Sequence, residues 1–336
     1  MKAWEIVSAG GVDALELNER PTPVPAHGDV LIRVRASSIN YRDLSTIEDP
    51  EPRRINYPTV PNSDCAGEIV ALGAGVSSFC VGDRVMGCFF RDWDSGSIST
   101  EIMASALGGA VDGVLAEEVI LPAHGVVRIP AHLSFEEAAT LPCAGLTAWN
   151  ALFGGAAVKP GETILLLGTG GVSVFAQQFA NIAGLKSIVT SSSDQKLLRI
   201  ADMGASGTIN YRQNPDWEQR VLELTNGQGV DRVVEVGGPG TLQKSISAVR
   251  VGGHIALIGI LSGAAGQIIP TDIMRKSLNV RGIYVGSRQM FEDMNQAIEI
   301  HKLKPVVDQV FAFQEARDAY HHMRNAGHFG KIVISI

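Results

Sequence analysis

The sequence predicts an α/β protein in which a doubly wound parallel sheet is joined to a second, β-rich domain. The chain has 336 residues, which suits about two domains, and its 45% hydrophobic residues are enough to build full cores. Short segments punctuated by proline and glycine fill roughly the first 125 residues. From about residue 134 apolar segments alternate with amphipathic ones, which is typical of a parallel sheet covered by helices on both faces.

The first part of the chain predicts strands and turns. A strand and turn open the chain, and Val30–Ala36 alternates apolar and charged residues as a half-buried strand does. Two more strands are expected at 59–69 and 82–86. We predict one domain from 1–125 together with a returning tail, 303–336, and a second domain from 126–302. The tail should contain a strand at 306–312, a helix at 314–325 and a strand at 331–336.

The second part alternates strands and helices. A capping box of Ser134 and Glu137 predicts a helix start. Strands are expected at 163–167, 187–190, 207–210, 230–236, 254–258 and 280–285. Helices are expected up to Ala183, over 194–203 with Ser192 as its cap, and at 217–224, 243–249 and 290–301.

Charge and cysteine content narrow the class of protein. The 28 basic residues against 35 acidic ones give a net charge of −7 without a basic cluster, so we expect neither nucleic acid nor an anionic membrane as partner. No apolar run reaches the roughly 18 residues that span a bilayer, and the first residues do not resemble a signal peptide. The four cysteines form no CxxC pair. We therefore expect a reduced, cytoplasmic enzyme with a small-molecule substrate.

A glycine-rich turn follows the apolar strand TILLL. Gly168, Gly170, Gly171 and Val172 lie in a GxGxxG-like pattern whose third glycine is replaced by Ser173. One glycine makes such a turn, the next lets the backbone approach a pyrophosphate, and the following helix N-terminus attracts the negative charge. The strand before and the helix after this turn predict a dinucleotide site.

The residues after the next strand favour NADPH over NADH. Ser191 stands where an NAD site places an acidic residue on the ribose, and it would not repel a 2′-phosphate. Lys196, one turn into the helix, supplies a cation, and Tyr211 a hydroxyl. Ser192 and Ser193 belong to the same turn. Asp194 is the alternative ribose ligand, although it also complements the helix dipole.

The chain resembles the medium-chain dehydrogenase/reductase superfamily over essentially its whole length. The resemblance rests on the β-rich first part, the sequence KPGETILLLGTGG and three short motifs. The motifs are Ser38–Asp43, Leu146–Ala148 and Ile209–Tyr211, which are similar to the zinc-independent quinone oxidoreductase branch. The resemblance implies a GroES-like catalytic domain, a Rossmann domain and an oligomer. We expect a homodimer, because Asn279–Val285 looks like an apolar edge strand that invites pairing with its copy.

Zinc is not expected. Where zinc-dependent relatives have a first Cys, a His-Glu pair and a second Cys, this chain has Asn40, Ser63 with Asp64, and Cys143. One thiolate and one carboxylate do not make a three-ligand zinc site. The cysteine-rich structural zinc loop is also missing, since Cys88 stands alone in its region.

The resemblance also suggests the remaining site residues. Asn40 supplies an amide donor to a carbonyl oxygen. Tyr41, expected in a loop, is a candidate proton donor, and Asp43 is expected to hold the same loop or its neighbour Arg42. Thr147 should lie near the nicotinamide carboxamide. The aromatic cluster Phe89, Phe90 and Trp93 either stacks on a flat substrate or forms a small core. Residues expected around the cofactor at the strand ends are Ile258, Gly259, Ile260, Val285, Gly286, Ser287, Phe329, Gly330 and Lys331.

The sequence thus predicts a zinc-free oxidoreductase that transfers hydride from NADPH to a quinone or an α,β-unsaturated carbonyl. Reduction of these substrates leaves a weakly basic oxyanion that hydrogen-bond donors can stabilise, whereas an unactivated ketone leaves a strongly basic alkoxide. One alternative is a metal-free alcohol or carbonyl dehydrogenase. Another, from a different class, is an NADPH-binding redox sensor without turnover.

Overall fold

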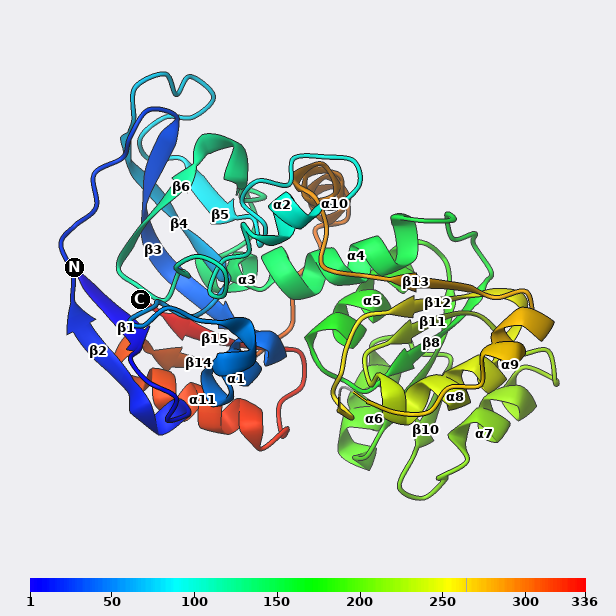
Figure 1. The fold of residues 1–336 in the computed structure, drawn as a ribbon. Coiled ribbons are helices and arrows are strands. Elements are labelled where there is room, and N and C mark those ends of the chain that lie inside the picture. Colours follow the sequence, from blue (N-terminus) through cyan, green and yellow to red (C-terminus); the bar gives the residue numbers. More distant parts are fainter. Residues whose placement is uncertain (264) are drawn as a thin grey trace. The chain divides into compact units, whose positions relative to one another are not determined.

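A seven-stranded sheet is the framework of the first of two compact units (Figure 1). This unit comprises 1–146 and 285–336, in a computed structural model that describes residues 1–263 and 265–336. The strands lie in the order β14-β15-β3-β4-β5-β7, and β6 pairs with β3. Their bounds are β3 (Asp29–Ile39), β4 (Asp64–Leu72), β5 (Arg84–Gly87), β6 (Glu118–Pro122), β7 (Val126–Arg128), β14 (Val307–Ala312) and β15 (Lys331–Ser335). β1 (Lys2–Ile6) and β2 (Leu15–Glu19) form a separate antiparallel pair.

The C-terminal strand β15 brings the end of the chain back to this sheet. It runs antiparallel to β3, with Ile332 opposite Ile39. Both side chains are fully buried in the core of the unit, so their burial fixes the register of the pair. This register brings Lys331, the residue before Ile332, to the end of β3 where Asn40 follows.

Helices surround the first sheet. They are α1 (Tyr41–Glu48), α2 (Thr100–Met103), α3 (Phe135–Ala139), α10 (Arg288–His301) and α11 (Ala316–Arg324), and a π-helical turn spans Leu141–Gly145. The predicted capping box of α3 is present, because Glu137 N–H donates to Ser134 Oγ and Ser134 N–H donates to Glu137 Oε2.

The second unit, 147–284, is built on a six-stranded parallel sheet. Its strands are β8 (Thr163–Leu167), β9 (Lys186–Ser191), β10 (Gly207–Asn210), β11 (Val230–Glu235), β12 (Val249–Leu257) and β13 (Asn279–Gly282). The helices are α4 (Leu146–Phe153), α5 (Gly171–Ile182), α6 (Asp194–Asp202), α7 (Trp217–Leu224), α8 (Pro239–Ala248) and α9 (Pro270–Arg275).

The strand order of this sheet is β10-β9-β8-β11-β12-β13, which is the Rossmann order 3-2-1-4-5-6. The order reverses between β8 and β11, and ligands of such sheets bind beyond the strand ends at that point. The side chains at 164–166 in β8 are fully buried, as the continuous apolar run predicts. The predicted fold class, a Rossmann parallel sheet together with a β-rich domain, is confirmed.

Several local expectations are wrong. Tyr41 begins a helix instead of lying in a loop, and the cap of α6 is Ser193, whose hydroxyl accepts from Lys196 N–H, rather than Ser192. The strand expected at 59–69 begins only at Asp64, and β13 ends at Gly282 rather than at Val285. The compact units divide at 146/147 and 284/285, whereas the predicted domains divide at 125/126 and 302/303. That predicted division stays a prediction.

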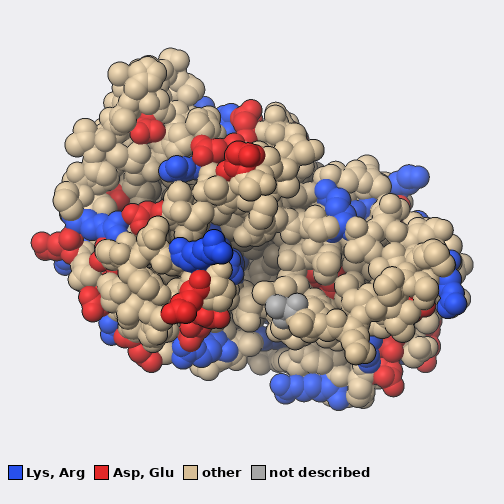
Figure 2. Space-filling view, viewed as in Figure 1, with Lys and Arg blue, Asp and Glu red and all other residues tan. Residues whose placement is uncertain are grey.

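The surface carries mixed charge on the face shown in Figure 2, where acidic and basic side chains are interspersed. Such mixing gives that face no strong field of a single sign. Among the described residues, no helix is both long and apolar enough to cross a membrane.

Candidate functional site

The glycine turn after β8 has room for a phosphate group. Gly168 has a φ of +77°, a conformation that favours glycine. Gly170 caps α5 with an ordinary φ of −79°, and a Cβ built there meets no atom within 4 Å. Neither backbone conformation nor packing in the described chain therefore requires glycine at 170. No side chain caps the N-terminus of α5, and helix N-termini of this kind leave backbone amides able to bind an anion. The pyrophosphate contact stays a prediction.

Ser173 replaces the third glycine of this turn without disturbing it. Its side chain is buried, and its hydroxyl donates to the Leu167 carbonyl oxygen at 2.7 Å. The hydroxyl therefore joins the end of β8 to the first turn of α5, the place where a third glycine allows close strand–helix packing.

The ends of β9 and β10 bring together the residues predicted to select the cofactor. Asn210 pairs with Ser191, and Tyr211 N–H donates to the Ser191 carbonyl oxygen at 3.0 Å. Ser191 Oγ accepts from Ser193 N–H at 3.3 Å, and Ser192 lies between them. Tyr211 is 42% exposed, and Lys196, in the first turn of α6, is half-buried.

Asp194, the alternative ribose ligand, is engaged within the protein. Its Oδ1 accepts from Asn210 Nδ2 at 2.6 Å and its Oδ2 from Gln213 Nε2 at 3.0 Å. Each carboxylate oxygen retains a second acceptor site, so Asp194 stays the alternative ribose ligand. Sequence reasoning missed Asn210 and Gln213, since their contacts with Asp194 arise only from the pairing of β10 with β9.

The other residues expected near the cofactor lie at strand and helix ends. Gly259 approaches the backbone of β11 so closely that a Cβ would lie 2.1 Å from the Val236 carbonyl oxygen. Ile258 precedes it and Ile260 is 48% exposed. Thr147 is buried at the start of the second unit.

Val285, Gly286 and Ser287 belong to the first unit. Val285 has a φ of +56°, which is a strained conformation for a β-branched residue. A Cβ at Gly286 would lie 2.9 Å from Leu146 Cγ, and Ser287 caps α10.

A buried polar cluster lies where β3 ends in the first unit. Lys331 Nζ donates to the Ile39 carbonyl oxygen at 2.7 Å and to Asn40 Oδ1, and it lies 3.8 Å from Asp64 Oδ2. Asn40 Nδ2 donates to Ser63 Oγ at 3.4 Å, and Ser63 Oγ donates to Asp64 Oδ1 at 2.9 Å. The exposed fraction of these four polar residues is 7% or less.

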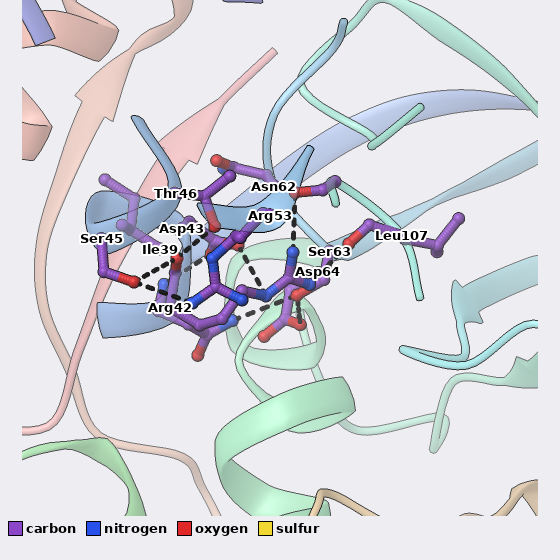
Figure 3. Close-up of polar contacts among 12 residues, drawn as sticks. Ile39, Arg42, Asp43, Ser45, Thr46, Arg53, Asn62, Ser63, Asp64 and Leu107 are labelled. Atoms are coloured by element: carbon purple, nitrogen blue, oxygen red, sulfur yellow. Dashed lines mark hydrogen bonds and ion pairs between the residues drawn. The ribbon is translucent and has the colours of Figure 1, made fainter. Parts of the chain in front are cut away.

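Asp43 supports this cluster from the first turn of α1. Its Oδ2 accepts from Asn40 N–H at 2.8 Å, and Arg42 Nε lies 3.7 Å from its Oδ1 (Figure 3). Burial raises the pKa of the Asp43 carboxyl, and the charge of Arg42 opposes that rise. Arg42 also donates to the carbonyl oxygens of Leu107 and Gly108. Asp43 thus holds the Asn40 backbone, and its catalytic role stays a prediction.

The aromatic candidates and Tyr41 differ in exposure. Phe89 and Phe90 are 1% exposed, with ring centroids 4.7 Å apart, and Trp93 packs edge-on against Phe90. The Arg42 guanidinium lies over the Phe89 ring. These contacts describe a small aromatic core, and the role of the three rings in substrate binding stays a prediction. Tyr41 is 46% exposed.

The residues before β15 turn tightly into the strand. Phe329 is buried, and its N–H donates to Asp308 Oδ1. Gly330 has a φ of +85°, and a Cβ there would lie 2.5 Å from the Val306 carbonyl oxygen. Lys331 points its ammonium group at Asn40, and its expected place near the cofactor stays a prediction. Sequence reasoning missed this contact, because only the pairing of β15 with β3 creates it.

Comparisons with known proteins decide the family. A family model described as "Alcohol dehydrogenase GroES-like domain" matches residues 26–131, and one described as "Zinc-binding dehydrogenase" matches 171–300. A zinc-type alcohol dehydrogenase-like protein of Schizosaccharomyces pombe is 44% identical over 97% of this chain and 96% of its own. The chain belongs to the medium-chain dehydrogenase/reductase superfamily.

Other superfamily members are also similar over their full length. The human quinone oxidoreductase is 28% identical over 99% of this chain and 97% of its own. A solved NAD-dependent alcohol dehydrogenase is 32% identical with a TM-score of 0.91, and a mycobacterial protein complexed with NADPH is 27% identical with a TM-score of 0.85. Each structure covers the whole of both chains. As a medium-chain dehydrogenase/reductase, the protein is an oxidoreductase, and its open glycine turn fits a nicotinamide cofactor.

Some names within the superfamily imply zinc, but the residues of this chain do not fit it. The described residues contain no group of three or more His, Cys, Asp or Glu side chains that could hold a metal. Cys143 and Asp64 are the zinc-ligand residue types present at these positions, and one thiolate with one carboxylate does not make a three-ligand site. The Lys331 ammonium group, already a cation, lies against Asn40 and Asp64. A second, divalent cation would be repelled there.

Proposed function

We propose that this protein transfers a hydride from NADPH to a quinone or an α,β-unsaturated carbonyl compound. The observation that carries the proposal is the buried cluster around Asn40, which offers an N–H donor and a nearby ammonium charge in place of metal ligands. Donors of this kind stabilise a weakly basic enolate or phenolate oxygen. An alkoxide would require a stronger acid.

The residues around the glycine turn support the choice of cofactor. Gly168, Gly170 and the first amides of α5 would hold the pyrophosphate. The ribose 2′ position would face Ser191, which carries no charge, with Lys196 and Tyr211 as partners for a phosphate. Asp194 already accepts from two side-chain amides, and a free ribose would add a third donor to the same carboxylate.

The reduced nicotinamide supplies the hydride, and the protein binds and polarises the acceptor. Asn40 Nδ2 has two N–H groups, and one of them donates to Ser63 Oγ. In the proposed reaction the other donates to the substrate carbonyl oxygen and holds the negative charge that develops there. The product enolate or phenolate then takes a proton from water or from the exposed Tyr41 phenol.

The experiment is to follow NADPH absorbance with three acceptor panels: quinones, enones and unactivated ketones. We expect turnover with the first or second panel and little with ketones. Turnover with ketones alone would replace the proposal by a metal-free carbonyl dehydrogenase. Tight NADPH binding with no turnover on any panel would replace it by a binding protein.

A further inference from the structure

Lys331 is a buried cation, and its ammonium group contacts the Asn40 side chain and the groups next to it. Its side chain is 4% exposed, and the Asp64 carboxylate, 3.8 Å away, is fully buried. Two of its three N–H groups donate to Ile39 O and Asn40 Oδ1. A buried ammonium group is costly unless it is paired and hydrogen-bonded, so its contacts are expected to be held firmly.

The ammonium group determines which way the Asn40 amide faces. An amide group can rotate by a half-turn and exchange its oxygen with its NH₂ at little steric cost. An ammonium group only donates, so only the amide oxygen can face Lys331 Nζ. With Oδ1 held in this way, Nδ2 must point to the opposite side.

Ser63 and Asp64 impose the same orientation from that opposite side. The Asp64 carboxylate only accepts, so the Ser63 hydroxyl hydrogen is directed to Asp64 Oδ1. Ser63 Oγ then presents lone pairs to Asn40 and can accept only from an N–H. Ser38 Oγ donates to the other Asp64 oxygen, Oδ2, and completes the support of the carboxylate. Hydrogen bonds thus run in one direction from Lys331 through Asn40 and Ser63 to Asp64, and the 3.8 Å ion pair between Lys331 and Asp64 closes the ring.

We propose that Lys331 is a positioning residue that fixes the Asn40 amide so that the Nδ2 N–H not donated to Ser63 is available to a substrate oxygen. This role differs from the cofactor contact expected for Lys331 from the sequence, and its catalytic part rests on the proposed function. Without the ammonium group, only the long 3.4 Å hydrogen bond to Ser63 Oγ opposes a half-turn of the amide. A turned amide would present its carbonyl oxygen to the substrate oxygen and repel the developing charge. The ring therefore selects acceptors that present an oxygen lone pair.

One test reads the amide orientation without turnover. Protein labelled with ¹⁵N-asparagine is examined by NMR, and the Asn40 side-chain signals are assigned by their loss in Asn40→Asp. In Lys331→Met we expect shifted signals and roughly tenfold faster exchange with water, because a hydrogen bond to a charged group is lost. Lys159→Met, at an exposed lysine, is the matched control and should leave the signals unchanged. Unchanged Asn40 signals in Lys331→Met would overturn the proposal.

Should Lys331→Met fail to fold because Asp64 is left unpaired, the double variant Lys331→Met/Asp64→Asn removes both charges together. The double variant also removes the carboxylate that directs the Ser63 hydroxyl hydrogen away from Asn40. The Asn40 signals should therefore change at least as much as in the single variant. Signals like those of the wild type in the double variant would likewise overturn the proposal.

A second test uses kinetics. In Lys331→Met we expect kcat with a quinone or enone to fall roughly 10- to 100-fold. The Kd for NADPH should stay within about twofold, since the affected group is the acceptor-binding amide. A weakened NADPH Kd with unchanged kcat would show a cofactor contact and overturn the proposal. If the wild type itself lacks turnover, the proposed function fails, and the NMR test still decides the role of Lys331.

Discussion

Lys331 and Asn40 lie 291 positions apart in the chain, yet the Lys331 ammonium group donates a hydrogen bond to the Asn40 amide oxygen. The contact exists because β15 pairs antiparallel with β3 in a register that sets Ile332 opposite Ile39. The last strand of the chain therefore supplies the charge beside the amide that follows β3.

The open space at Gly170 predicts a loss of binding without a loss of folding. Gly170→Ala should change the free energy of unfolding by no more than about 1 kcal/mol, because the new Cβ meets none of the described residues within 4 Å. NADPH affinity should fall about tenfold or more, since that Cβ occupies the phosphate space. Fluorescence titration and thermal unfolding measure the two effects.

Gly259→Ala is the matched control for that variant. Its Cβ would lie 2.1 Å from the Val236 carbonyl oxygen, so the free energy of unfolding should fall by about 1–3 kcal/mol. A large stability loss in Gly170→Ala, or undiminished NADPH affinity, would contradict the assignment of the turn.

Cofactor preference follows from Ser191 and Lys196. One lysine paired with a phosphate at a partly exposed site contributes about 1–2 kcal/mol, which is about a five- to thirtyfold preference for NADPH over NADH. Lys196→Ala should remove most of this preference and leave NADH kinetics nearly unchanged. Ser191→Asp should invert it, because the carboxylate repels the phosphate and accepts from a free ribose. Equal affinity of the wild type for both cofactors at low salt would show that the assignment is wrong.

Asn40 is expected to act on turnover rather than on cofactor binding. Asn40→Ala should lower kcat roughly ten- to a thousandfold with NADPH Kd little changed, because it removes the donor to the developing oxyanion. Steady-state kinetics with a quinone or enone, together with NADPH titration, check this. Wild-type turnover in Asn40→Ala would contradict this prediction and show that another donor, such as Tyr41, stabilises the oxyanion.

Metal analysis tests the zinc prediction. Protein purified without added metal should contain far less than stoichiometric zinc and keep its activity in chelator, because the donor set at Asn40, Ser63, Asp64 and Cys143 does not suit the ion. Stoichiometric zinc, with activity lost to the chelator, would refute this prediction.

The edge strand β13 predicts a homodimer. It lies at the end of the six-stranded sheet, and Val280 within it is 36% exposed. Pairing of this edge with its copy would satisfy the unpaired backbone groups and cover Val280. Light scattering at micromolar protein should give the dimer mass, and Val280→Asp should shift it toward the monomer. A monomeric wild type would contradict the prediction.

The sequence by itself determined most of the second unit and the glycine turn that follows its first strand. The strands at 163–167 and 207–210 and the helix at 217–224 have the predicted bounds, because continuous apolar strands and amphipathic helices are local patterns. The glycine turn was predictable for the same reason, since its strand, glycines and helix are contiguous. The loss of zinc-ligand residue types could also be predicted from single positions.

Only the tertiary structure decided the arrangement around Asn40. Helix α1, with Tyr41 at its start, is too short to show a clear helical period, and it is held by burying Leu44 and Ile47 in the core of the first unit. The aromatic residues at 89, 90 and 93 carry no signal that separates a pocket wall from a core. Above all, strand pairing depends on packing between segments distant in the chain, so no local pattern could predict that Lys331 would meet Asn40.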